Sequence, residues 1–169
     1  MTPIGALARG VLAGGFGTMA MDALWFYRYK RGGGDSSLFD WEFSVGLNDW
    51  SQASAPAQLG KRLFEAFFQH ELAPQWAPLT NNIMHWWYGL AWASVYGLVA
   101  GSSSQPRVRW GFPFGCLVWG LSYVILPLAQ VYKPIWQYDL PTLGKDLSAH
   151  LVYGVGTAAT FRALVAKPK

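Results

Sequence analysis

The sequence predicts an all-α membrane protein, a bundle of four membrane-crossing helices, and three observations support this prediction. Of the 169 residues, 52% are hydrophobic and 13% are charged, about half the charged share of a soluble domain. Four segments are apolar over about the 20 residues that a helix needs to cross a bilayer. Small residues recur four positions apart inside these segments. The composition excludes a disordered chain, a coiled coil and a disulfide scaffold.

The predicted spans cover residues 4–27, 83–100, 110–132 and 147–166 of a single domain, residues 1–169. The second and third contain no Asp, Glu, Lys or Arg. Aromatic residues lie at their ends on one side of the membrane, as they do at the level of lipid headgroups. Pro127, near the end of the third span, is expected to bend that helix or to loosen its last turns.

Small residues predict how the four helices associate. Helices in lipid are held together by close backbone packing, because lipid gives them no hydrophobic reason to associate. The predicted contact residues are Gly10, Gly14, Gly89, Ala93, Gly97, Gly111, Gly115 and Gly154. A compact bundle is therefore expected.

The segment between the first two spans, residues 28–82, is long and lies outside the membrane. An amphipathic period appears over residues 57–72, where Leu59, Leu63 and Phe67 share one face. This pattern predicts a surface helix that lies on the lipid headgroups or, equally, one that docks on the bundle of its own chain.

The distribution of positive charge between the two sides of the membrane gives only weak evidence for the orientation of the protein. The net charge is +4, and the basic residues are scattered, so no nucleic-acid partner is expected. Six of the thirteen Lys and Arg residues, including Lys167 and Lys169, fall on the side of the two termini and seven on the other side. We expect both termini in the cytoplasm, and lipids as partners, with a homo-oligomer or a larger membrane complex as further possibilities.

One motif occurs twice. His-x-x-Tyr-Gly-x-x-x-Ala starts at His85 and again at His150, and two glycines four apart precede each copy, at positions 10 and 14 and at positions 111 and 115. Either the repetition is due to chance, or the chain contains two copies of a two-span hairpin. Duplication would place the symmetry axis along the membrane normal.

The spans bring polar side chains to one depth in the bundle. This predicted polar cluster consists of Asp22, His85, His150, Asp146, Gln130, Tyr88 and Tyr153. A charge inside a membrane is costly, so Asp22 should face the bundle interior and find a hydrogen-bond donor, with His85 and His150 as candidates.

Four roles for the cluster stay open at this stage. It could be a structural hydrogen-bond network that clamps the helix ends. It could carry protons or a solute, since histidine titrates near neutral pH. His85 and His150 could ligate haem from two faces, or could bind a divalent metal together with Asp22.

Motifs of common enzymes are absent from the sequence, which has no phosphate-binding loop, His-Glu-x-x-His or Gly-x-Ser-x-Gly. The single cysteine, Cys116, lies in an apolar run, as a packing residue would. We therefore expect no enzymatic activity and no cofactor.

The chain resembles small four-span bacterial inner-membrane proteins of the YagU-like kind. The residues that carry the resemblance are His85 to Gly89, Tyr96-Gly97, the glycine-rich third span ending near Pro127, and His150 to Gly154. The resemblance implies a location in the bacterial inner membrane and does not identify any catalytic residues.

Three functions are compatible with these observations. The favoured one is a non-enzymatic membrane protein, an accessory subunit or a stress-related scaffold. The second is a small oligomeric transporter or channel with a proton-linked Asp/His path. The third is a membrane subunit that binds haem through two histidines.

Overall fold

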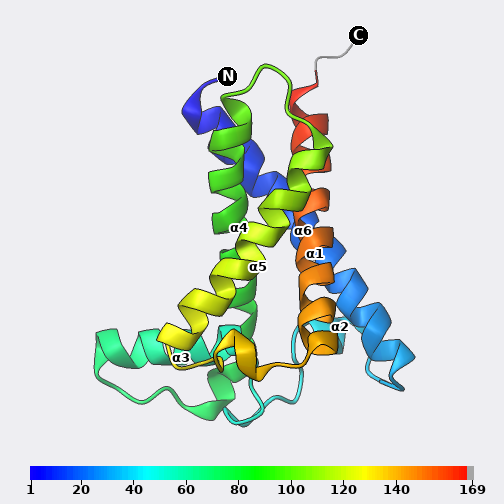
Figure 1. Cartoon of the computed structure of the whole chain (residues 1–169). Coiled ribbons are helices and arrows are strands. Elements are labelled where there is room, and N and C mark those ends of the chain that lie inside the picture. The colour runs from blue at the N-terminus through cyan, green and yellow to red at the C-terminus, as the bar shows by residue number, and fades with distance from the viewer. Residues whose placement is uncertain (167–169) are drawn as a thin grey trace.

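The structure, a computed structural model, describes residues 1–166, and in that range it has six α-helices and no strand. The prediction of an all-α protein is therefore confirmed. Four long helices stand together as a bundle, and two shorter helices lie across one of its ends (Figure 1). Lys167 and Lys169, which entered the charge comparison, lie outside the described residues.

The long helices are α1 (Pro3–Arg31), α4 (Ala77–Gly101), α5 (Gly111–Leu128) and α6 (Leu140–Val165). The short ones are α2 (Leu38–Glu42) and α3 (Ala55–Phe68). Three 3-10 turns occupy Pro74–Trp76, Val108–Trp110 and Ile135–Gln137. Helices α4 and α6 begin well before their predicted spans at 83 and 147. Asp139 fixes the start of α6, because its side chain caps the helix by accepting the Thr142 amide at 2.7 Å.

The third predicted span, residues 110–132, is wrong at its end, because α5 stops at Leu128. Pro127 lies in the last turn of that helix. Gln130 follows in the left-handed conformation, with a φ of 54°. The backbone therefore leaves the helix directly after the proline, and Tyr132 belongs to the connection with α6.

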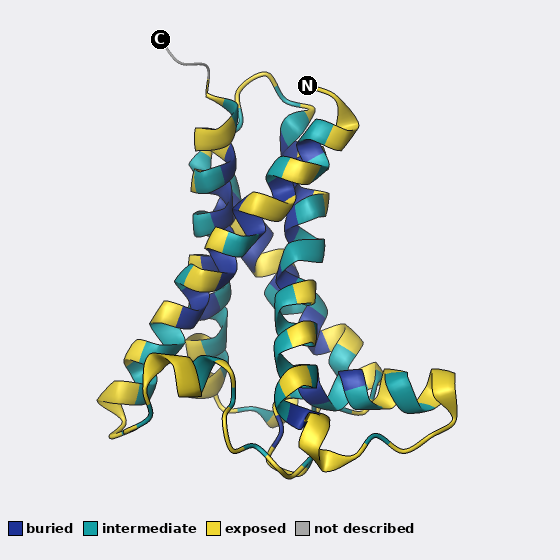
Figure 2. Ribbon diagram, turned by 180° about the vertical axis from the view of Figure 1, so that it is seen from behind, coloured by how far each residue is buried: buried dark blue, intermediate teal, exposed yellow. Residues whose placement is uncertain are grey.

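Small residues make the contacts between the long helices, as the sequence predicts. Helix α1 packs against both α4 and α6, and α6 packs against α5. A methyl group added at Gly97 would lie 2.5 Å from the carbonyl oxygen of Ala6 and 2.8 Å from the Cα atom of Gly10. On the other side of α1, Gly17 faces Thr157 of α6. The buried residues follow these contacts along the bundle (Figure 2).

Helices α4 and α5 meet through aromatic rings instead. The rings of Tyr96 and Phe114 have centroids 4.8 Å apart, and the edge of Phe161 packs on Tyr96 at 5.8 Å. Tyr153 completes this group beside Phe114 at 5.6 Å. These rings fill the interior near the middle of the bundle, and beyond them the helices diverge toward the end where α2 and α3 lie (Figures 1 and 2).

The two copies of the motif pack in a similar way but not in the predicted register. Gly14 faces Gly89 and Leu90, whereas Gly111 faces Gly154 and Val155. When the His85 and His150 motifs are superposed, Gly14 therefore corresponds to Gly111. The sequence predicts that Gly10 corresponds to Gly111, so the observed pairing is shifted by one helical turn. The close contact between α1 and α6 also has no counterpart between α4 and α5 among the described residues. An internal duplication stays a prediction, and its symmetry is broken.

Helix α3 docks on the bundle of its own chain. Its Gly60 packs against Thr80 and Met84 of α4, and Ala57 is fully buried. The helix ends at Phe68 and not at residue 72, because Gln69 adopts the left-handed conformation that ends many helices. The outer side of α3 stays apolar, and Phe67 is 80% exposed.

Two segments within the described range are long and apolar enough to cross a membrane. They are Pro3–Arg31, which is α1, and Val108–Leu128, which includes α5. Helices α4 and α6 are long enough, but they are not among the segments that are apolar enough.

Replacing Gly97 by Ala should destabilise the bundle, because the added methyl group has no room between α4 and α1. Overpacking of this kind costs about 1–3 kcal/mol, and the melting temperature should fall by several degrees. Thermal unfolding in detergent measures this change. The matched control is Gly120→Ala on α5, where nothing lies within 4 Å of the added atom. Equal melting temperatures for the two variants would contradict the close approach.

Candidate functional site

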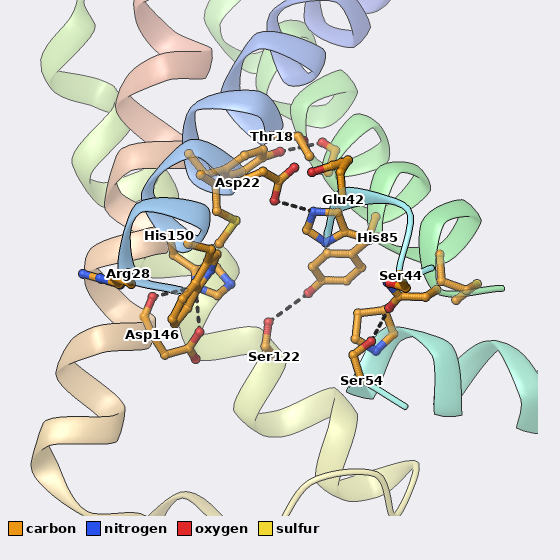
Figure 3. Close-up of a pocket in the computed structure, with 18 of the residues that line it drawn as sticks. Thr18, Asp22, Arg28, Glu42, Ser44, Ser54, His85, Ser122, Asp146 and His150 are labelled. Carbon is orange, nitrogen blue, oxygen red and sulfur yellow. Dashed lines mark hydrogen bonds and ion pairs between the residues drawn. The ribbon is translucent and has the colours of Figure 1, made fainter. Parts of the chain in front are cut away.

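A cavity of about 1050 Å³ occupies the wide end of the bundle. Helices α1, α4, α5 and α6 form its walls, and residues of α2 and α3 with their connections form its floor. The side chains that line it include Thr18, Asp22, Arg28, Glu42, Ser44, Ser54, Asn82, His85, Ser122, Asp146 and His150 (Figure 3). Aromatic and aliphatic side chains cover much of the remaining wall.

The centre of the site is a pair formed by Asp22 and His85. The Nε2 atom of His85 lies 2.8 Å from Oδ1 of Asp22 (Figure 3). Asp22 is 7% exposed, and its second oxygen, Oδ2, is buried without a hydrogen-bond partner among the described residues. A buried carboxylate oxygen without a partner is unfavourable, so this atom marks a place where a ligand group or water would be stabilised.

Glu42 joins this pair from α2. Its Oε1 atom accepts a hydrogen bond from Nε1 of Trp86 at 3.2 Å. Burial raises the pKa of Glu42, and the negative charge of Asp22 raises it further. Two carboxyl groups and one imidazole therefore share one corner of the cavity.

Hydrogen bonds hold the floor to the bundle. Asn81 donates to the hydroxyl of Ser44 at 2.9 Å and accepts from the hydroxyl of Ser54. At the other edge, Arg62 of α3 donates to the carbonyl oxygens of Ala129 and Gln130, at 2.8 and 3.1 Å. The segment from residue 32 to 76 is thereby tied to both α4 and the end of α5.

His150 has a different partner from His85. Its Nδ1 atom lies 2.9 Å from the backbone oxygen of Asp146 and 3.4 Å from the Oδ1 atom of the same residue. The two residues are one turn apart on α6. Asp22 therefore has a single histidine partner, and the second histidine is held by its own helix.

Two tyrosines connect helices across the cavity. The hydroxyl of Tyr88 lies 3.2 Å from that of Ser122 on α5. Tyr153 donates to the carbonyl oxygen of Gly89 at 2.5 Å and so ties α6 to α4. These equivalent residues of the two motifs reach different helices, as expected from the broken symmetry of the bundle.

Six of the seven residues of the predicted polar cluster line the cavity, and one does not. Gln130 is exposed in the turn after α5, and it is not among the lining residues. Its prediction was wrong because the helix was expected to continue to residue 132. The sequence did not predict Glu42 as a site residue, because residues 35–54 have no periodic pattern. Only the folding of the chain brings α2 beneath α4.

Two arginines that line the cavity are held by groups other than Asp22. Arg28 donates to the carbonyl oxygen of Lys145 at 2.8 Å and to the hydroxyl of Ser148 at 2.7 Å, and its guanidinium lies 5.0 Å from the ring of Trp25. Arg31 donates to the hydroxyl of Tyr27 at 3.2 Å. These contacts join the ends of helices and leave the Asp22 corner without a cation of its own.

Metal binding receives no support from the geometry. Within residues 1–166 no group of three His, Cys, Asp or Glu side chains is placed to hold a metal ion. His85 and His150 also each have one ring nitrogen in a hydrogen bond, to Asp22 and to Asp146 respectively. The arrangement is suited instead to holding a polar or charged group in an otherwise apolar chamber.

Asp22→Asn and His85→Ala should each lower the melting temperature in detergent, and their effects should not add. Residues that interact directly show coupling energies of about 0.5–3 kcal/mol in a double-mutant cycle. His70→Ala is the control, because His70 is exposed and lies outside the helices. Combined with Asp22→Asn, it should give additive effects. Additivity of the Asp22 and His85 variants would show that the pair contributes nothing to stability.

Glu42→Gln should stabilise the protein at neutral pH. The pKa of Glu42 is raised in the folded chain above its ordinary value of 4.5, so folding disfavours the ionised form. This penalty is present above the folded pKa and disappears as the pH falls below 4.5. Melting temperatures across this pH range measure the difference. A variant less stable than the parent at neutral pH would mean that the bond from Trp86 outweighs the penalty.

Comparison of this chain with protein families, with curated proteins and with solved structures finds no match. The resemblance to the YagU-like family and the location in the bacterial inner membrane that it implies stay predictions.

Proposed function

We propose that this chain is an integral membrane protein whose four long helices cross the bilayer and whose cavity binds a small molecule. The observation that carries the proposal is the cavity itself, a chamber of about 1050 Å³ with polar groups on its wall. Its walls are formed by helices whose outer faces are apolar.

Large apolar side chains on the outside of the bundle support the membrane location. Each of the four long helices exposes several, namely Val11, Leu12 and Phe16 on α1, Trp87, Val95 and Val99 on α4, Leu117, Val124 and Ile125 on α5, and Val152 and Leu164 on α6. An apolar surface of this extent is unfavourable in water and favourable in lipid.

Helices α4 and α6 are not among the segments apolar enough to cross a membrane, but their polar residues are directed to the interior. Asn82 and His85 of α4 and Asp146 and His150 of α6 line the cavity, whereas lipid would contact only the outer faces of these helices. Both helices are therefore proposed as spans beside α1 and α5.

A cavity of this kind favours a transporter or a carrier over a purely structural protein. A polar cluster that only clamps helices would be surrounded by packed side chains. Here Oδ2 of Asp22 is buried without a partner beside an open volume. Pockets that bind small molecules share this combination of apolar walls and a few convergent polar groups.

The cavity is closed at its inner end by the rings of Tyr96, Phe114, Tyr153 and Phe161. Passage of a solute would require these rings to move, or a second copy of the chain to complete a path. We therefore keep the homo-oligomer, with lipids as the surrounding partners, as part of this proposal. No observation favours haem binding.

Cysteine labelling tests the membrane location and the cavity together. In a Cys116→Ser background, Ser122→Cys places a thiol on the cavity wall, and Val124→Cys places one on the outer face of the same helix. In intact membranes a water-soluble maleimide should label position 122 and not position 124, because lipid excludes both the reagent and the thiolate that reacts with it. Both positions should be labelled after denaturation.

Equal labelling of the two positions in membranes would place the outer face of α5 in water and would overturn the four-span arrangement. Absence of labelling at position 122 would show that the cavity is closed to solutes. The two parts of the proposal are thus tested separately.

A further inference from the structure

The Asp22 corner of the cavity lacks a positive charge. Asp22, Glu42 and His85 meet there from α1, α2 and α4. With His85 protonated and both acids ionised, the three groups carry a net charge of −1, and with His85 neutral they carry −2. A charge imbalance in a partly buried site is unfavourable unless a proton or a counter-ion is bound.

One buried atom points directly to a ligand. Asp22 is 7% exposed, His85 occupies only its Oδ1 atom, and Oδ2 has no partner among the described residues. Figure 3 shows this carboxylate directed into the cavity beside Glu42 and His85. The free carboxylate oxygen can only accept a hydrogen bond, so the missing group is a donor or a cation.

Three basic residues line the cavity, and in the described part of the chain none of them forms an ion pair with Asp22 or Glu42. Arg28 is bound to the backbone oxygen of Lys145 and to Ser148. Arg31 is exposed and is bound to Tyr27. Lys145 lines the cavity from α6, on the same side as Asp146 and His150.

The rest of the wall fits an apolar body. Trp25, Trp41 and Tyr88 line the cavity around the charged corner. On the opposite side, α5 contributes Val118 and Leu126. Aromatic faces attract cations as well as apolar groups, and this attraction increases when the cation is desolvated.

We infer that the cavity binds an organic monocation, with the charge beside Asp22 and Glu42 and the apolar body against α5. The inference rests on the proposed function, because it names the class of ligand for the same cavity. A neutral lipid-soluble molecule would leave the charge imbalance unchanged, and an anion would increase it.

Charge balance makes binding depend on pH. A bound cation competes with protonated His85 for the negative charge of Asp22. When one cation binds, up to one proton is released to the solvent, either from His85 or from Glu42. The other charged and ionisable groups that line the cavity are Arg28 and Arg31 of α1, Lys145, Asp146 and His150 of α6, and its tyrosines. The affinity for the cation should therefore rise with pH.

Three probes of similar shape and different charge test the inference. They are tetraphenylphosphonium, tetraphenylborate and the uncharged triphenylphosphine oxide. Calorimetric titration of the full chain in nanodiscs, with protein-free nanodiscs subtracted, should show the phosphonium binding at least about tenfold more tightly than either of the others, since the attraction of a desolvated cation to aromatic faces and carboxylates contributes at least about this much. The affinity should rise with pH.

Variants locate the charge. Asp22→Asn and Glu42→Gln should each weaken phosphonium binding by about tenfold or more and leave binding of the oxide unchanged. Glu71→Gln removes a negative charge from an exposed position outside the cavity and should change nothing. Glu42→Gln and the comparison of probes on the parent chain keep the test decisive if Asp22→Asn does not fold.

The possible failures are distinguishable. If the oxide binds as tightly as the phosphonium, the cavity holds small molecules without selecting for charge, and only this inference fails. If phosphonium affinity is the same in Glu42→Gln and in the parent chain, the charge does not lie at the Asp22 corner. If none of the probes binds, the proposed function fails as well.

Discussion

The close approach of α1 to both α4 and α6 is the contact on which the rest of the structure depends. Gly10 and Gly14 bring α1 against α4, and Gly17 brings it against Thr157 of α6. Side chains at these positions would separate the backbones, so the three helices can form this core only with small residues at the contacts. Helix α5 packs closely on α6 and meets α4 through aromatic rings instead of a close backbone contact. The fourth side, between α4 and α5, is therefore left wider than the other three.

The cavity follows from this asymmetry. Aromatic rings span the gap between α4 and α5 at the level of Tyr96 and Phe114, and no comparable ring pair closes it at the wide end among the described residues. The helices that diverge there carry Asp22, His85 and His150 on their inner faces. A two-fold symmetric bundle would have packed α4 against α5 as closely as α1 against α6. The loss of symmetry leaves the open space and places the polar residues on its wall.

The Asp22 corner illustrates a conflict between stability and binding. Burial disfavours the ionised form of Glu42, and the nearby negative charge of Asp22 adds to this effect, which is why the pKa of Glu42 is raised. The same repulsion makes the site receptive to a cation. Binding of the proposed cation should restore part of this stability, because binding to the folded state stabilises it. The floor segment takes part directly, since it carries Glu42.

The sequence alone determined where the long helices lie, which small residues form their contacts, and that polar side chains gather at one depth of the bundle. These properties depend on local patterns. Apolar runs predicted the long helices, spacing by four predicted that Gly97 and Gly111 lie at contacts, and the cost of a charge among apolar residues required a partner for Asp22. The tertiary structure decided which residue is the partner of Asp22. Asp22 pairs with His85 because α1 packs on α4 along the Gly14 face, whereas His150 is held by Asp146 on its own helix. The end of α5 at Pro127 removed Gln130 from the site, and the return of residues 32–76 beneath the bundle added Glu42. Such placements depend on the path of the chain between helices, and residue spacing along the sequence does not specify it.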